Sequence, residues 1–296
     1  MHNLTKQFKT FEKEKKTNQI NNIDFIYIIN LDHRPERFQK CLRQFQRYQI
    51  DPQRFSAIYG WELSQENFND IGIKVTADTQ FDRPVHFRPA SWQDRPEFIT
   101  SSSIGKTCVH FTMAGGALGC YLSHLSILAD AYKQGYETIW ILEDDFTLEG
   151  DPHQLSEYIH KLDHLPDALD WDILYTDDDS YYTLDNIIGQ LQGENAPYYG
   201  ECLVRPNLPL SSIQIDRQPI GSDFFKISGR AQTHSMVLRR SGIKKILDFL
   251  EPRGIFRPYD MDVAFIPDIK LYNLTCGLIH GRIRKDPSET NIKLKK

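Results

Sequence analysis

Two clusters of acidic residues follow apolar segments that have the length of buried strands. The segment Thr138–Leu142 ends in the cluster Glu143–Asp145. The segment Asp172–Thr176 ends in the cluster Asp177–Asp179. Ligands of open α/β sheets bind at the carboxyl ends of the strands, where carboxylates can hold a divalent cation that bridges substrate phosphates. The two clusters predict such a cation site, with acidic residues that only begin the next loop as the open alternative.

The net charge of −5 conceals a strong asymmetry along the chain. Residues 143–185 contain 14 acidic residues and one basic residue, Lys161, a net charge of −13. Residues 1–16 carry +3 and residues 282–296 carry +4. Because affinity for phosphate backbones needs positive surface, a nucleic-acid binder is not expected. The two basic ends are expected to be solvated tails, with at most peripheral contact with an anionic membrane.

The cysteines and the hydropathy pattern bear on the cellular compartment. The five cysteines are odd in number and widely spaced, so neither a disulfide framework nor a structural zinc site is indicated: Cys41, Cys108, Cys120, Cys202 and Cys276. No apolar stretch approaches the roughly 20 residues of a membrane span, and the N-terminal segment lacks the apolar core of a signal peptide. These features predict a cytoplasmic protein with reduced thiols.

The elements that must position the acidic clusters alternate between strands and helices. The apolar run Asp24–Ile29 predicts a strand that is buried on both faces. Residues Pro35–Tyr48 predict a helix, because proline suits its first turn and apolar residues recur at helical spacing. A second strand is expected at Arg54–Ile58, and a leucine-faced helix that Gly135 can close precedes the first acidic cluster. The alternation predicts an α/β fold with a mostly parallel central sheet flanked by helices.

The chain is expected to form one catalytic domain with tails. A polar, basic segment at residues 1–22 precedes the domain, which spans residues 23–281, and a basic tail follows at residues 282–296. Two stretches within the domain, residues 62–110 and 186–230, are weakly patterned and are interpreted as loop-rich insertions.

The turn at residues 29–37 follows the first strand and opens the first helix. Its backbone N–H groups, together with Arg34 and Arg37, are suited to an anionic ligand, and a plain surface helix is the alternative. The glycines of residues 115–119 lack the Gly-Lys-Ser/Thr ending of a phosphate loop, so a nucleoside-triphosphate fingerprint is not supported.

Four blocks of the sequence resemble glycosyltransferase family 25, which includes bacterial lipooligosaccharide glycosyltransferases and procollagen galactosyltransferases. The blocks are IINLDHRPER at Ile28–Arg37, FSAIYG at Phe55–Gly60, GALGCYLSHLS at Gly116–Ser126 and ILEDD at Ile141–Asp145. A looser match lies at residues 233–242. The third and fourth blocks carry the most specific part of the resemblance.

The resemblance implies a GT-A type, Rossmann-like fold, a divalent cation (Mn²⁺ or Mg²⁺) and a nucleotide-sugar donor, commonly UDP-galactose. It makes Asp145 the first metal ligand, supported by Glu143 or Asp144, and His280 a further candidate ligand. The residues that would bind the donor are Asn30, Leu31, Arg34, Arg37, Ala57, Ile58, Gly60, Ser123, His124 and Asp144. The partner substrates would be this nucleotide sugar and a saccharide or protein acceptor.

The reaction that this implies is transfer of a hexose to an acceptor hydroxyl, with inversion at the sugar carbon. One carboxylate must take the acceptor proton. Asp177 is a candidate for this base because it ends the strand after the metal motif, and Asp260 and Asp262 compete with it. The resemblance leaves the cluster Asp177–Asp179 unexplained.

Two other classes of function stay open at this point. The first is a non-catalytic protein that binds nucleotide sugars and descends from such an enzyme. The intact cluster Glu143–Asp145 argues against it. The second is a metal-dependent phosphoesterase that uses both acidic clusters, but the His/Asp ligand motifs usual for that chemistry are missing.

Overall fold

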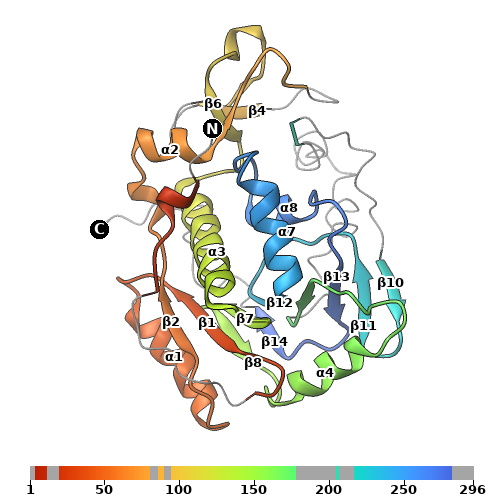
Figure 1. Ribbon diagram of the computed structural model, residues 1–296. Helices are drawn as coiled ribbons and strands as arrows, with labels where there is room; N and C mark the ends of the chain where they lie inside the picture. Colours follow the sequence, from red (N-terminus) through yellow and green to blue (C-terminus); the bar gives the residue numbers. More distant parts are fainter. Residues whose placement is uncertain are drawn as a thin grey trace, which may run out of the picture.

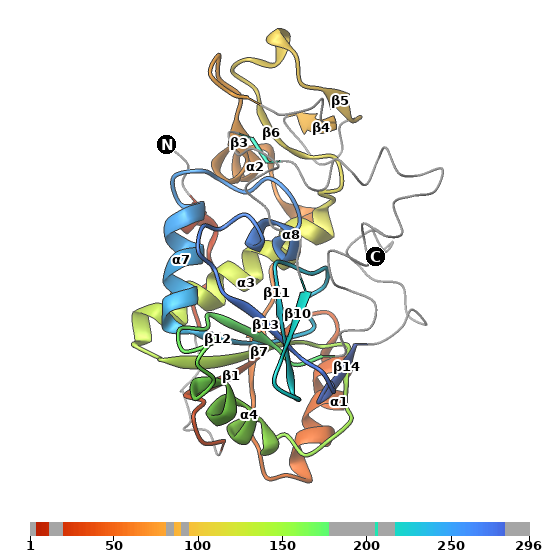
Figure 2. The same ribbon diagram turned by 90° about the vertical axis from the view of Figure 1, so that its right-hand side faces the viewer.

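The structure is a computed structural model that describes residues 4–11, 20–80, 86–89, 95–177, 205–206 and 217–281. Its centre is an eight-stranded sheet with helices on both faces (Figures 1 and 2). The strands in spatial order are β10 (Arg217–Ile220), β11 (Phe224–Ile227), β13 (Leu271–Leu274), β9 (Ile173–Tyr175), β12 (Ser235–Arg239), β7 (Thr138–Glu143), β1 (Phe25–Asn30) and β2 (Gln53–Ser56).

The sheet is mixed rather than uniformly parallel. β1 pairs in parallel with both β2 and β7, and β9 pairs in parallel with β13. β12 lies between β7 and β9 and is antiparallel to both, with Ser235 opposite Leu142 and Met236 opposite Tyr175. The carboxyl ends of β7 and β9 therefore meet the amino end of β12, which brings residues before Ser235 to the predicted ligand edge.

Alternation along the buried strands divides the core into two layers. In β1, Phe25, Tyr27 and Ile29 belong to one apolar cluster, and the residues between them belong to the other. β7 alternates in the same way, with Ile141 in the first cluster and Leu142 in the second. Successive side chains of a strand point to opposite faces, so the strand needs apolar residues at every position when both faces are covered.

Helices cover both faces of the central sheet (Figure 2). The long helix α3 (Gly115–Gln134) and α7 (Arg240–Leu250) lie on one face, and α1 (Pro35–Gln46) and α4 (Gln154–Asp163) lie on the other. α3 ends at Gly135, whose φ of 77° is the left-handed conformation that favours glycine. The short helix α8 (Tyr259–Val263) contacts α3. The predicted α/β sheet flanked by helices is confirmed.

Residues 62–110, expected to be loop-rich, contain regular elements in their described part. The short helices η2 (Gly60–Glu62), α2 (Gln65–Ile71) and η3 (Ser101–Ser103) alternate with an antiparallel four-stranded sheet at one end of the molecule (Figure 1). Its strands in spatial order are β3 (Ile73–Lys74), β6 (Thr107–His110), β4 (His86–Pro89) and β5 (Glu97–Phe98). Most of the second insertion, residues 186–230, and the tail at 282–296 lie outside the described residues.

Two further short elements complete the described chain. The strands β8 (Phe146–Leu148) and β14 (Ile279–Gly281) pair antiparallel beyond the first acidic cluster, with His280 opposite Thr147. The helix η1 (Leu4–Gln7) belongs to the N-terminal segment, where Leu4 is buried against the α3 side of the core. None of the helices within the described ranges combines the length and apolar character needed to cross a lipid bilayer.

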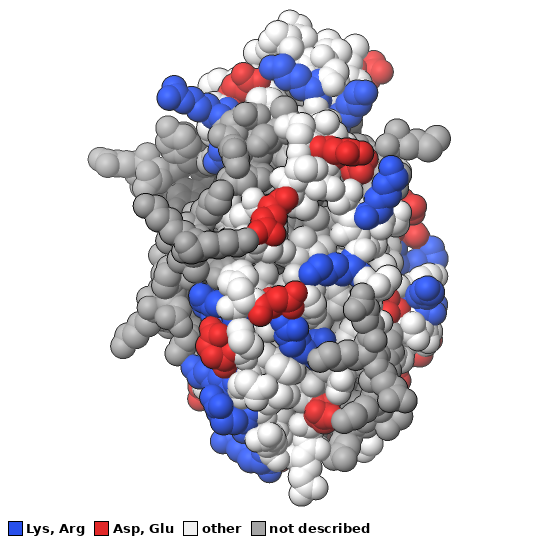
Figure 3. Space-filling model, turned by 90° about the vertical axis from the view of Figure 1, so that its left-hand side faces the viewer, with Lys and Arg blue, Asp and Glu red and all other residues white. Residues whose placement is uncertain are grey.

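Acidic side chains after residue 143 are paired with basic side chains from later in the chain. Arg239 donates to Asp163 at 2.5 Å, and Lys245 donates to Asp172 at 2.6 Å. Ser241, the second residue of α7, also donates to Asp172. The face seen in Figure 3 carries both positive and negative side chains. Two carboxylates of the −13 segment are thus paired with side chains that lie more than 70 residues away in sequence.

Candidate functional site

A pocket opens where the carboxyl ends of β1, β2 and β7 meet the start of α3. Its lining combines the four sequence blocks: Ile29, Leu31, Arg34, Arg37, Ala57, Ile58, Tyr59, Gly60, Trp61, Gly116, Cys120, Ser123, Glu143, Asp144 and Asp145. Two arginines and three carboxylates meet there, together with the amino end of the long helix α3. Backbone N–H groups at the start of a helix favour anions.

Two glycines allow the β2–η2 loop to lie directly against α3. A Cβ atom placed on Gly60 would lie 1.9 Å from the carbonyl oxygen of Gly115 and 2.4 Å from the nitrogen of Gly119. A Cβ on Gly119 would in turn lie 2.4 Å from the carbonyl oxygen of Ile58. Ser123 Oγ then accepts a hydrogen bond from the Ile58 N–H at 2.8 Å. These contacts set the wall of the pocket that the sequence analysis assigned to the nucleotide.

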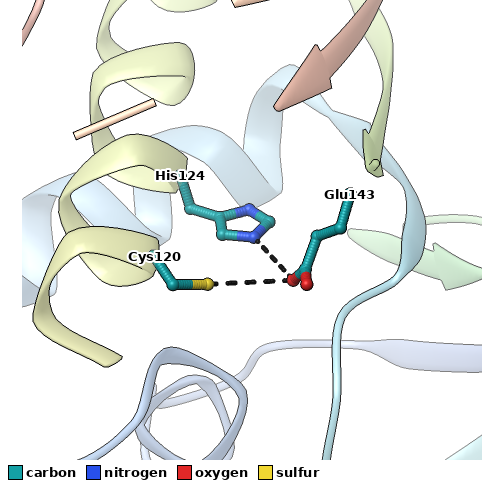
Figure 4. A group of neighbouring side chains, drawn as sticks. All are labelled: Cys120, His124 and Glu143. Atoms are coloured by element: carbon teal, nitrogen blue, oxygen red, sulfur yellow. Dashed lines mark hydrogen bonds and ion pairs between the residues drawn. The ribbon is translucent and has the colours of Figure 1, made fainter. Parts of the chain in front are cut away.

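Glu143 points toward α3, on the same face of the sheet as Ile141. Its Oε1 accepts a hydrogen bond from Thr233 Oγ1 at 2.7 Å and lies 3.2 Å from His124 Nε2. Cys120 Sγ donates to the same oxygen at 3.8 Å (Figure 4). Burial alone would raise the pKa of Glu143, but the bond and charge of His124 and the hydrogen bond from Thr233 lower it to about 2. Glu143 is therefore ionised throughout the physiological range.

Asp144 points to the other face, toward α1. Asn30 Nδ2 donates to its Oδ2 at 2.6 Å, and Arg37 Nη1 donates to its Oδ1 at 3.1 Å. Burial raises the pKa of Asp144 to about 6 although both of these partners lower it. Both oxygens of Asp144 are thus engaged by the block that follows β1. This contact ties the first and fourth sequence blocks together.

Asp145 differs from its two neighbours because one of its oxygens is buried without a hydrogen-bond partner. Within the described residues, Oδ1 accepts no hydrogen bond, and His234 Nε2 lies 3.9 Å from it. Burial raises the pKa of Asp145, the charge of His234 opposes this, and the charge of Glu143 adds to it. An unpartnered buried carboxylate oxygen costs free energy unless a ligand supplies the missing partner.

His234 was not among the predicted site residues, yet it joins the two acidic strand ends. It precedes β12, and its carbonyl oxygen accepts the Glu143 N–H at 3.0 Å. Its Nδ1 lies 3.6 Å from Asp177 Oδ2, and its Nε2 faces Asp145. Burial lowers the pKa of His234, but Asp177, Asp145 and Glu143 together raise it to about 9. The imidazolium therefore belongs to the acidic cluster as a counter-ion.

The second acidic strand end is organised differently from the first. Asp177 is 1 % exposed, and Arg230 Nη2 donates to its Oδ2 at 2.9 Å. The same guanidinium donates through Nη1 to Asn273 Oδ1 at 2.5 Å and lies over the Tyr175 ring. Asp177 is thereby part of a buried ion pair behind the pocket. Asp178 and Asp179 lie outside the described residues.

Asp260 and Asp262, two residues apart in α8, have different environments. Asp260 is partly exposed and accepts the N–H groups of Gln232 and Met261. Burial raises its pKa, and the charge of Glu143 adds to this increase. Asp262 is 1 % exposed. Its oxygens accept hydrogen bonds from three groups: Arg205, Tyr121 and the Phe256 N–H.

The structure brings most of the predicted donor residues to the pocket. Asn30 and His124 are the exceptions, because each stands behind a carboxylate that it holds. Of the predicted metal ligands, Glu143 and Asp145 line the pocket. His280 is not among the lining residues; it lies on β14, opposite Thr147 of β8. Pocket residues that were missed include Trp61 and Cys120, although both lie within or beside the sequence blocks.

Comparison with known sequences decides the family. The sequence profile described as "Glycosyltransferase family 25 (LPS biosynthesis protein)" matches residues 23–262. This chain belongs to glycosyltransferase family 25. The matched range holds all four blocks and every described residue that lines the pocket.

Individual members of the family are more distant. The chain is 29 % identical over 162 residues to "Procollagen galactosyltransferase 1-B" of Xenopus laevis, which covers 54 % of this chain and 22 % of that protein. It is 27 % identical over 172 residues to a "Glycosyltransferase 25 family member" of Drosophila melanogaster, covering 58 % and 24 %. It is also 24 % identical over 152 residues to "Inactive glycosyltransferase 25 family member 3" of Homo sapiens, covering 51 % and 21 %. The matches span less than a quarter of these relatives.

Proposed function

We propose that this protein is a metal-dependent glycosyltransferase that moves galactose from UDP-galactose to a hydroxyl group of a saccharide or a hydroxylated protein, with inversion. The observation that carries the proposal is Asp145, which lines a pocket built from the family's blocks and whose buried Oδ1 has no hydrogen-bond partner within the described residues. Family membership supports the reaction class, and the printed name of the Xenopus laevis relative favours galactose as the sugar.

The residues at the pocket fit a hard divalent cation such as Mn²⁺ or Mg²⁺. Asp145 offers an unpartnered carboxylate oxygen, and Glu143 beside it carries a full negative charge. These two residues would hold the cation, with His280 as a further candidate. A cation bound there would neutralise the charge that develops on the leaving diphosphate.

The opposite wall of the pocket suits the nucleotide end of the donor. Arg34 and Arg37 stand at the start of α1, and Gly116 lies in the first turn of α3. Guanidinium groups and the free N–H groups of a helix start both bind phosphate oxygens. Tyr59 and Trp61 flank Gly60 and offer aromatic surface to a base or sugar ring. The pocket thus matches an anionic ligand with a planar end.

Asp260 is the carboxylate that best suits the general base. A base must be reachable by the acceptor and must have a pKa above that of an ordinary surface carboxylate. Asp260 is partly exposed, its pKa is raised, and two backbone N–H groups orient it. Asp177 and Asp262 are each 1 % exposed and paired with an arginine. Asp260→Asn is expected to lower kcat about 10²–10⁴-fold while donor binding is kept.

Sugar transfer by the full chain tests the proposed function. UDP release and labelled acceptor are measured with UDP-galactose, UDP-glucose and UDP-N-acetylglucosamine, on a panel of saccharides and hydroxylated collagen peptides. The protein is first stripped with EDTA, and Mn²⁺ is then added back. We expect turnover with UDP-galactose only after Mn²⁺ is restored, and an inverted anomer in the product. Full turnover in EDTA would show that the metal dependence is wrong.

The non-catalytic alternative remains an outcome of the same experiment. One relative is named as inactive, so a family member without turnover has a precedent. If UDP binds with Mn²⁺ but no donor is consumed with any acceptor, including water, the chain is a nucleotide-sugar-binding protein. Loss of turnover in Asp177→Asn with full turnover in Asp260→Asn would instead reassign the base.

A further inference from the structure

Three side chains of different chemistry converge at the wall of the pocket (Figure 4). Cys120 Sγ, His124 Nε2 and Glu143 Oε1 all lie within 4.8 Å of one another. Sγ is 3.8 Å and Nε2 is 3.2 Å from the carboxylate oxygen. Neither Cys120 nor this combination was among the metal ligands that the sequence predicted.

The cluster follows from the local geometry of the fold. Residues four apart lie above one another on the same face of a helix, so Cys120 and His124 both face the sheet from α3. Alternation along β7 turns Glu143 toward the same helix, because Ile141 two residues earlier also lies on that side. The contact of Gly119 with the β2–η2 loop leaves the adjacent Cys120 at the pocket wall.

Two of the three separations are close to those between ligands of a tetrahedral zinc ion. Zn–S, Zn–N and Zn–O bonds of about 2.3, 2.0 and 2.1 Å give ligand–ligand distances of about 3.6 Å for S···O and about 3.4 Å for N···O. The observed distances are 3.8 and 3.2 Å. Zinc sites with three protein ligands keep the fourth position for water or another ligand. Here Cys120 and Glu143 both line the donor pocket, so the fourth position would open into it.

Two independent observations favour a cation at this point. His124 is fully buried and held by stacking on Tyr259, with ring centroids 4.6 Å apart and an interplanar angle of 9°. The ring is therefore already oriented with Nε2 toward the carboxylate. In addition, two further acidic residues, Asp144 and Asp145, line the same pocket as Cys120 and Glu143. Neighbouring carboxylates repel one another, and a bound cation relieves that repulsion.

We propose that Cys120, His124 and Glu143 form a binding site for a thiophilic divalent cation of the zinc class. Thiolate and imidazole select such ions, whereas the carboxylate of Asp145 suits a hard ion, so the two sets of ligands differ in the metal they take. Glu143 belongs to both sets. Occupation of the thiophilic site therefore competes with the hard cation for one ligand. The proposal rests on geometry alone and stands whether or not the protein transfers sugar.

Cobalt titration of the full chain tests the site directly, because a thiolate bound to Co²⁺ gives a charge-transfer band in the near ultraviolet. The reduced, EDTA-stripped protein is titrated with CoCl₂, and ZnCl₂ is then added to displace the cobalt. We expect one equivalent of Co²⁺ to produce the band and Zn²⁺ to abolish it. Cys120→Ser should remove the band and weaken Zn²⁺ binding more than about tenfold, the loss that even an outer-sphere partner commonly causes.

The controls separate this site from other thiols and from the hard-cation site. Cys276→Ser removes an exposed cysteine and Cys202→Ser removes one outside the described residues, and both should keep the band. Should Cys120→Ser fold poorly by circular dichroism, alkylation of the wild-type protein replaces it: Zn²⁺ should protect Cys120 but not Cys276. Absence of the band, its persistence in Cys120→Ser, or no protection of Cys120 would each overturn the proposal. Cobalt binding without the band, lost in Asp145→Asn, would mean a hard-cation site only.

Discussion

The carboxyl ends of β7 and β9 share a sequence pattern but differ in how their acidic side chains are paired. Each strand is apolar, and each is followed by acidic residues. At the end of β7, Asp145 faces the pocket with a buried oxygen that has no partner within the described residues. At the end of β9, Asp177 is 1 % exposed and its Oδ2 is paired with Arg230, although its Oδ1 also lacks a hydrogen-bond partner within the described residues. One strand end is free to take a ligand, and the other is already neutralised.

The difference comes from a residue that lies far along the chain. Arg230 stands 53 residues after Asp177, and its guanidinium also bonds Asn273 on β13. β7 receives no such arginine at Asp145; His234 approaches only to 3.9 Å. Of these two acidic strand ends, the one that suits a ligand is therefore the one whose carboxylate is not paired with an arginine. The same pattern at β9 serves stability instead.

Removal of the arginine should have the largest effect on this contrast. Arg230→Met leaves Asp177 buried without its strongest partner, and such losses cost about 3–5 kcal/mol. We expect urea unfolding to show this loss of stability. Arg43→Met, at an exposed position of α1, is the matched control and should change the free energy of unfolding by less than about 0.5 kcal/mol. Equal stability of the two variants would mean that the ion pair contributes nothing.

The next largest effect should distinguish Asp145 from Asp177, because substitution of the first should lower activity and substitution of the second should lower stability. Asp145→Asn keeps the shape of the side chain but removes the charge that faces the pocket, so kcat should fall about 10²–10³-fold with the fold intact. Asp177→Asn should instead lower stability and leave kcat of the folded protein within a few-fold. Steady-state transfer kinetics and thermal melting of both variants provide the comparison. The reverse outcome would make β9, rather than β7, the catalytic strand end.

Much of the β7 end could be predicted from the sequence because its partners are local or periodic. Alternation of apolar residues places Glu143 and Asp144 on opposite faces, and the block after β1 supplies Asn30 and Arg37 to one of them. The close approach of Gly60 and Gly119 likewise lies within recognisable blocks. These features follow from the spacing of residues along single elements.

The β9 end could not be predicted in this way, because its partners are set by the order of strands in the sheet. The antiparallel insertion of β12 between β7 and β9 brings Thr233 and His234 to both acidic ends. No local pattern indicates that order. For the same reason the sequence pattern makes Asp177 a candidate base and gives no sign of its pairing with Arg230.

His234, which links the two strand ends, should make the stability of the fold depend on pH. Its pKa of about 9 in the folded protein exceeds the ordinary 6.5, so the protonated ring stabilises the fold fully below pH 6.5. This contribution, about 3 kcal/mol, is lost as the pH rises through 9. In EDTA, wild-type stability should therefore decline between pH 6.5 and 9.5, and His234→Asn should lack that decline. Parallel pH profiles from urea unfolding would contradict the assignment.

The smallest effect is expected from Ser123 of α3, which holds the pocket wall near the end of β7. Ser123 Oγ accepts the Ile58 N–H and donates to the Gly119 carbonyl. Ser123→Ala leaves the N–H without a partner, which costs about 1–2 kcal/mol.

Since Ile58 lines the pocket, part of that loss should appear as weaker UDP binding by calorimetry. Ser126→Ala is the matched control, because Ser126 makes the same bond to the helix backbone but accepts from Lys9 instead. It should lower stability without changing UDP affinity. Equal UDP affinity in both variants would mean that the loop holds its position through the glycine contacts alone.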